Sequence, residues 1–95
     1  MSEIGFKVND NGKIINVSYN GDMTCEQFMR DFSKKHTNYE SIDHNIYLFK
    51  VNGMILNGKD KNDQYKYLGK KIKEVITNEQ TVRFIRKKLI SYSKI

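Results

Sequence analysis

One stretch of the chain has the apolar spacing of an amphipathic helix, and it limits what the rest can form. Intervals of three and four residues separate Cys25, Phe28, Met29 and Phe32, which places them on one side of a helix. Thr24 opens a Thr-x-x-Gln capping box, so the helix is predicted over residues 25–36. A single helix cannot bury such a stripe alone, so the other segments must supply an apolar face that covers it.

Those other segments alternate apolar and polar residues, as strands do. Asn11-Gly12 favours a tight turn and gives a predicted hairpin of residues 4–8 and 13–19. The remaining predicted elements are strands at 45–51, 54–56 and 81–86, a charged loop at 57–66 and a short helical turn within 67–75. The predicted fold class is α+β, with a mixed sheet of four to five strands packed on one helix in the order β-β-α-β-β-β.

The size and composition of the chain indicate one intracellular domain. Its 95 residues suit a single small core. No apolar run is long enough to span a bilayer, and the start of the chain has no secretory pattern. Cys25 is the only cysteine and cannot form an internal disulfide. We therefore expect a cytoplasmic or nuclear monomer.

Positive charge is concentrated in the second half of the chain. Residues 1–49 hold five basic and seven acidic residues, and residues 50–95 hold twelve basic and four acidic ones. A field of this kind attracts nucleic acid, acidic protein or anionic lipid. The chain is also rich in lysine, asparagine and isoleucine and lacks proline and alanine, so much of this charge can be compositional background.

The order and spacing of these elements resemble the ubiquitin-like (β-grasp) family. The resemblance rests on the hairpin closed by Asn11-Gly12-Lys13, the helix opened by Thr24, the run from Leu48 to Gly53, and the last strand from Thr81 to Arg86. It spans residues 4–88. It implies a ubiquitin-like domain at residues 1–88, followed by a basic flexible tail at 89–95.

Two departures from the family pattern bear on function. Conjugated members end in Gly-Gly after the last strand, whereas residues 87–95 contain no glycine. The central aliphatic position of the family's usual binding surface corresponds to Lys50, and its loop leucine falls near Asp10. The resemblance therefore implies a module that binds proteins without conjugation, and one that ordinary ubiquitin receptors bind poorly.

The predicted binding site lies on neighbouring strands. Apolar and cationic side chains point away from the helix at Ile46, Leu48, Lys50, Arg83 and Ile85. Apolar anchors within a charged surround are typical of protein-binding patches. Two alternatives stay open: a basic domain that binds nucleic acid through Arg86, Lys87 and Lys88, or a modifier whose Gly-Gly tail is absent from this chain.

No catalytic or metal-binding constellation is visible, so we expect no enzyme activity and no cofactor. Cys25 lies on the apolar stripe, where a buried thiol is the ordinary outcome. His36 and His44 are isolated, and a metal site needs clustered ligands. Residues 60–63 have the acidic start of a calcium loop but lack its glycine and closing glutamate.

Overall fold

The computed structural model describes residues 3–77 and 80–87. These ranges contain five strands and two helices, in the order β1 (Glu3–Asp10), β2 (Lys13–Asn20), α1 (Cys25–Thr37), β3 (Tyr47–Val51), β4 (Met54–Ile55), α2 (Ile72–Val75) and β5 (Thr81–Arg86). Lys88 and the predicted tail at 89–95 lie outside the described residues, so the boundary between domain and tail stays a prediction.

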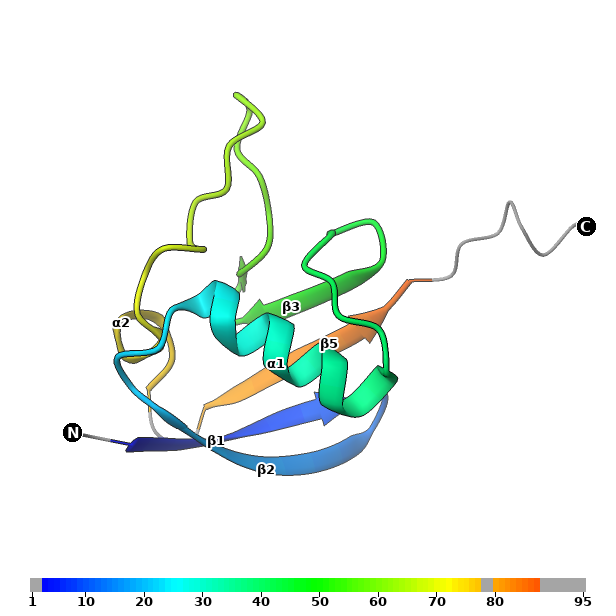
Figure 1. Cartoon of the computed structure of the whole chain (residues 1–95), viewed down its shortest axis with the longest axis vertical. Helices are drawn as coiled ribbons and strands as arrows, with labels where there is room; N and C mark the ends of the chain where they lie inside the picture. Colours follow the sequence, from blue (N-terminus) through cyan, green and yellow to red (C-terminus); the bar gives the residue numbers. More distant parts are fainter. Residues whose placement is uncertain (1–2, 78–79, 88–95) are drawn as a thin grey trace, which may run out of the picture.

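The strands form one mixed sheet, and α1 crosses one of its faces (Figure 1). The strand order is β2-β1-β5-β3-β4. The central β1 and β5 are parallel, while β1/β2, β3/β5 and β3/β4 are antiparallel. The predicted α+β arrangement of five strands and one main helix is therefore confirmed.

The β1–β2 hairpin forms where the sequence predicts it. Eight residue pairs run in register without a bulge, from Glu3 opposite Asn20 to Asp10 opposite Lys13. Asn11 and Gly12 link the strands with φ values of 55° and 92°. Positive φ at both turn positions matches the right-handed twist of the strands, which is why Asn-Gly suits this turn.

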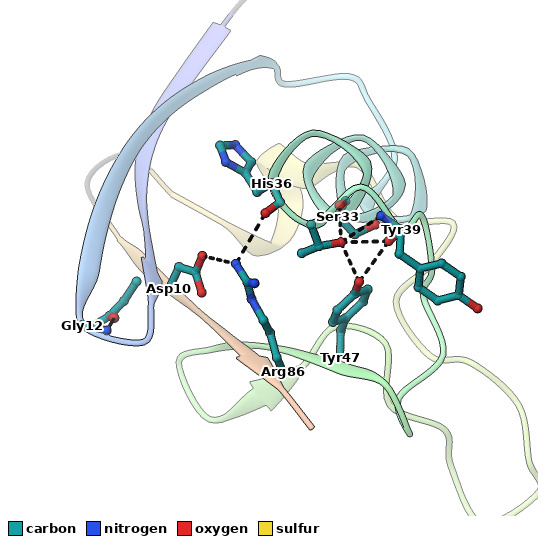
Figure 2. Close-up of polar contacts among 9 residues, drawn as sticks. Asp10, Gly12, Ser33, His36, Tyr39, Tyr47 and Arg86 are labelled. Atoms are coloured by element: carbon teal, nitrogen blue, oxygen red, sulfur yellow. Dashed lines mark hydrogen bonds and ion pairs between the residues drawn. The ribbon is translucent and has the colours of Figure 1, made fainter. Parts of the chain in front are cut away.

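Helix α1 begins at the predicted capping box and buries the predicted stripe. The Thr24 hydroxyl accepts from the Gln27 N–H at 3.1 Å, and the Gln27 side chain accepts from the Thr24 N–H at 3.0 Å. Cys25, Phe28, Met29 and Phe32 are buried, and so is Ser33, which is not part of the predicted stripe. The helix ends at Thr37, whose hydroxyl lies 2.6 Å from the Tyr47 hydroxyl and ties α1 to β3 (Figure 2).

The core between α1 and the sheet is rich in aromatic rings. Phe32 lies 5.2 Å from Phe84 and 6.3 Å from Phe49 between ring centroids, in edge-to-face geometry. Such pairs add to the free energy gained by burial. The core places α1 against the middle of one face of the sheet (Figure 1).

Residues 57–71 leave the body of the protein as a long loop, which we name the arm (Figure 1). Buried Asn57 anchors its base: the side chain accepts from the Phe49 N–H and donates to the carbonyls of Ile42 and Tyr47. At the other end, the carbonyls of Lys70 and Leu68 accept from the first N–H groups of α1. Both ends of the arm are therefore held against the core.

Several elements differ from their predicted bounds. Strand β3 begins at Tyr47 rather than residue 45, because the Ile46 and Tyr47 N–H groups bond to the Asp43 carbonyl in a turn. The predicted helical turn is confined to α2, and the predicted loop at 57–66 extends through the arm to Lys71. Within the described residues, no helix has the length and apolar character needed to cross a membrane.

Candidate functional site

The sheet face opposite α1, which we name the outer face, carries a continuous row of side chains. Cross-strand pairing joins Ile14, Asn9, Arg83, Lys50 and Ile55, one residue from each strand in spatial order. Directly paired residues project to the same side of a sheet. The row therefore has two cations near its centre and an isoleucine at each end.

Four of the five predicted site residues come together on this face. Leu48 pairs with Ile85, and Lys50 pairs with Arg83, two positions apart in the β3–β5 ladder and therefore on the same face of the sheet. We name these four residues the outer patch. Within the described chain, Leu48 and Ile85 belong neither to the buried core nor to the apolar side chains packed against it. Both side chains are half-buried on the outer face.

The fifth predicted residue, Ile46, does not share this position. It precedes β3, and its half-buried side chain packs against the hydrophobic core. Alternation along the strand placed Ile46 outward with Leu48, but the turn before β3 breaks that alternation. We therefore assign Ile46 to the packing of the domain rather than to the site.

The structure also separates the predicted basic cluster. Arg86 pairs with buried Tyr47 and so lies on the α1 side of the sheet. Its guanidinium contacts the Asp10 carboxylate at 2.6 Å and the His36 carbonyl at 3.5 Å (Figure 2). Lys87 is exposed beyond β5, and Lys88 lies outside the described residues. Arg86 thus links β5, β1 and the end of α1.

Charge is compensated on the helix side and uncompensated on the outer face. Around α1, Arg30 pairs with Glu26 and Glu40, and Lys35 pairs with Asp31. By contrast, neither Lys50 nor Arg83 forms an ion pair with any acid in the described chain. Like charges directly opposite each other destabilise a sheet. The paired Lys50 and Arg83 therefore form a site of uncompensated positive charge on the outer face.

A groove of about 730 Å³ borders the outer patch where β1 ends and β5 continues. The β1–β2 turn forms one wall and residues 83–86 form the other. Asp10, bound to Arg86, lies in this groove with only 12% of its side chain exposed. The outer patch is therefore bordered by this groove at Ile85.

The residues considered for catalysis or metal binding are not arranged for either. Cys25 is fully buried, and burial raises the pKa of its thiol to about 11. His36 stacks on Phe32 with ring centroids 4.2 Å apart. The Asp60 carboxylate accepts from the Asn62 and Gln64 N–H groups and so caps a turn. Among the described residues, no three His, Cys, Asp or Glu side chains form a group that could hold a metal ion.

The sequence reasoning missed Ile14 and Ile55, which extend the apolar margin of the outer face. Ile14 is 47% exposed. Its neighbour Ile15 takes the inward position, so one of these two adjacent isoleucines had to face outward. That doubled isoleucine was a usable signal. Ile55 had no such signal, because β4 has two residues and too little length to show alternation.

No model of a known protein family matches the chain, and no curated protein matches it either. Solved structures do. A ubiquitin-like domain of an Arabidopsis thaliana protein has a TM-score of 0.62 and 17% identity, covering 94% of this chain and 82% of that one. The ubiquitin-like domain of yeast Ddi1 has a TM-score of 0.61 and 11% identity, with 93% of each chain covered.

A third similar structure is a crystal structure of ATBAG1 in complex with HSP70. It has a TM-score of 0.57 and 6% identity and covers 96% of this chain and 44% of that one. At these identities the comparisons establish the fold alone. They agree with the strand order and the helix position described above, and the fold is that of ubiquitin-like β-grasp domains.

Proposed function

We propose that this chain, which has a ubiquitin-like β-grasp fold, is a protein–protein interaction module that acts by non-covalent contact through the outer patch. The observation that carries the proposal is the pairing of Lys50 with Arg83 across two strands, with Leu48 and Ile85 beside them. An apolar pair next to two uncompensated cations is suited to a partner that supplies an aliphatic side chain flanked by carboxylates.

Three further observations support action by non-covalent contact. Conjugation of ubiquitin-like proteins uses a Gly-Gly tail after the last strand, and residues 70–95 do not supply one, because they contain no glycine. ATBAG1, of whose chain 44% is matched by this fold, was crystallised in complex with HSP70, which supports a protein as the kind of partner. The thiol of Cys25 is buried, so it offers no nucleophile at the surface.

The experiment compares variants that alter the patch without touching the core. The chain is used to isolate partners from extract of its source cells, and the recovered partner is then titrated by calorimetry. We expect Leu48→Ala and Ile85→Ala each to weaken binding about tenfold, as truncation of an apolar anchor does. Lys50→Glu/Arg83→Glu is expected to abolish it, because the patch would then repel the partner's carboxylates.

A matched control keeps the change in net charge but moves it elsewhere. Lys34→Glu/Lys61→Glu alters two exposed cations, one on α1 and one at the tip of the arm, and should bind like the wild type. Equal loss in both charge variants, or capture that disappears on nuclease treatment, would favour a nucleic-acid partner instead. Unchanged binding by the Leu48 and Ile85 variants would remove the outer patch from the proposal.

Conjugation is tested separately, with the activating enzyme of the source organism and ATP. We expect no thioester to form on a protein made of residues 1–95, since residues 70–95 contain no glycine for that chemistry. A thiol-reducible adduct would contradict non-covalent action and make the protein a modifier.

A further inference from the structure

Strand β2 is an unusually unprotected edge of the sheet. It is the outermost strand next to β1 and runs for eight residues without a bulge. Residues 14–20 contain no charged residue and no proline. Edge strands are normally shielded by charge, proline, bulges or short length, because their free backbone groups can pair with another chain. Strand β4, at the other edge, has only two residues.

The register of the hairpin shows which backbone groups are free. A two-residue turn makes Asp10 and Lys13 a hydrogen-bonded pair, and such pairs then alternate along the ladder. The N–H and C=O groups of Ile14, Asn16 and Ser18 therefore point away from β1. No hydrogen bond from another part of the described chain reaches them.

We propose that two copies of this chain pair through β2, antiparallel and about a two-fold axis at Asn16. Strand β2 would then lie inside a continuous ten-stranded sheet. Ile14 of each copy would lie opposite Ser18 of the other, and the two Asn16 residues opposite each other. This register keeps the core-facing residues of both copies on the α1 side. It also gives hydrogen-bond partners to the free backbone N–H and C=O groups of Ile14, Asn16 and Ser18.

Charge complementarity favours a second copy as the occupant of this edge. In this register Lys13 faces Tyr19 of the other copy. The Tyr19 hydroxyl donates to Asp31 Oδ2 at 2.8 Å, and Lys35 contacts the same oxygen at 3.2 Å. Asp31 Oδ1 has no described contact, and Lys13 has no described ion pair. Two-fold symmetry would therefore bring each Lys13 toward an Asp31 carboxylate, twice per dimer.

Sedimentation of the full chain from about 10 µM to about 1 mM tests the proposal, because one strand pair forms a small and weak interface. We expect a reversible dimer in the wild type. Asn16→Lys should weaken it at least about tenfold by placing two ammonium groups opposite each other on the axis. Thr81→Lys is the matched control. Thr81 is paired with Lys7, as Asn16 is, but it belongs to the central strand β5 and lies away from the β2 edge, so this variant should dimerise normally.

The register is tested by cross-linking with an added thiol oxidant. Asn16→Cys should form a disulfide between copies, because directly paired positions lie about 5.5 Å apart between Cα atoms. Ser18→Cys should not, since its counterpart would be four residues away, about 13 Å along the strands. Buried Cys25 is common to both variants and serves as an internal control.

Three results would overturn the proposal. The first is a wild-type chain that stays monomeric at about 1 mM. The second is a dimer that persists in Asn16→Lys, which would place the interface elsewhere. The third is a monomer whose Ile14, Asn16 and Ser18 amides become protected only on binding an extended segment of another protein, which would make this edge a site of heterologous strand addition.

Discussion

Cys25 illustrates how burial determines the chemistry of a single residue. Its thiol has a pKa of about 11 in the folded chain, against about 8.5 for a free cysteine. Between those values the unfolded state has lost the proton and the folded state has kept it. The contribution of this thiol to the unfolding free energy is therefore fully present below about pH 8.5, and it is lost as pH rises toward 11.

We expect the difference in unfolding free energy between wild type and Cys25→Ala to shrink by about 2 kcal/mol from pH 7 to pH 10. Urea unfolding of both proteins across this range measures it. The alanine variant supplies the control, because it lacks the thiol and retains every tyrosine and lysine. Parallel pH profiles for the two proteins would show that the thiol is not protected from ionisation.

The direction of side chains was predicted correctly where alternation along a strand is unbroken. It was predicted wrongly where a contact with another segment intervenes. Val82, Phe84, Arg83 and Ile85 lie as the β5 pattern predicts. Ile46 does not, because a turn precedes β3. Arg86 was read as a surface cation, yet an acid from β1, far away in the sequence, holds it on the α1 side. Local periodicity carries no information about such a distant partner.

At the scale of elements, the arm depends on one buried amide. Asn57→Ala would leave the Phe49 N–H and two carbonyls without their partner inside the protein. We expect a loss of about 2–4 kcal/mol of unfolding free energy, because buried polar groups without partners are costly. Urea unfolding measures the loss, and hydrogen exchange should accelerate most at the Phe49 amide.

Asn62→Ala, at the exposed tip of the same arm, is the control and should change stability by less than about 0.5 kcal/mol. A similarly small effect of Asn57→Ala would mean that the base of the arm is not held by this side chain. The sequence showed a charged loop here but gave no sign of its anchor, since asparagine is ordinarily a surface or turn residue.

The hairpin and α1 were predictable because each carries its own signals: alternation with Asn-Gly for the first, and a stripe with a capping box for the second. The outer patch was predictable in part, because it follows from alternation once β3 and β5 are neighbours. The groove and the β2 edge depend on where the chain places β1 relative to β5, which no local pattern contains.

At the scale of the whole molecule, the Arg86–Asp10 ion pair joins β5, β1 and the end of α1 (Figure 2). We expect Arg86→Gln to lower the unfolding free energy by about 1–2 kcal/mol, since Asp10 is mostly buried and would lose its charged partner while Arg86 is half exposed. Thermal or urea unfolding checks this expectation.

Lys87→Gln is the neighbouring control and should change stability by less than about 0.5 kcal/mol, because Lys87 is exposed and forms no described ion pair. Equal effects of the two substitutions would show that net charge, rather than the contact between three elements, determines the stability. The comparison also matters for binding studies, since a variant that includes Arg86 would confuse weaker folding with weaker binding.

The central position of β5 has a consequence for how the protein is made. A ribosome delivers β1 first and β5 last, yet these two strands are neighbours, and β5 alone connects the β1–β2 hairpin to β3 and β4. Until residues 81–86 emerge, the nascent chain holds two half-sheets and a helix whose apolar stripe is only partly covered. Pairing between such distant segments is slow to form. The nascent domain is therefore most prone to aggregation just before residues 81–86 emerge, when its apolar surfaces are made but not yet covered.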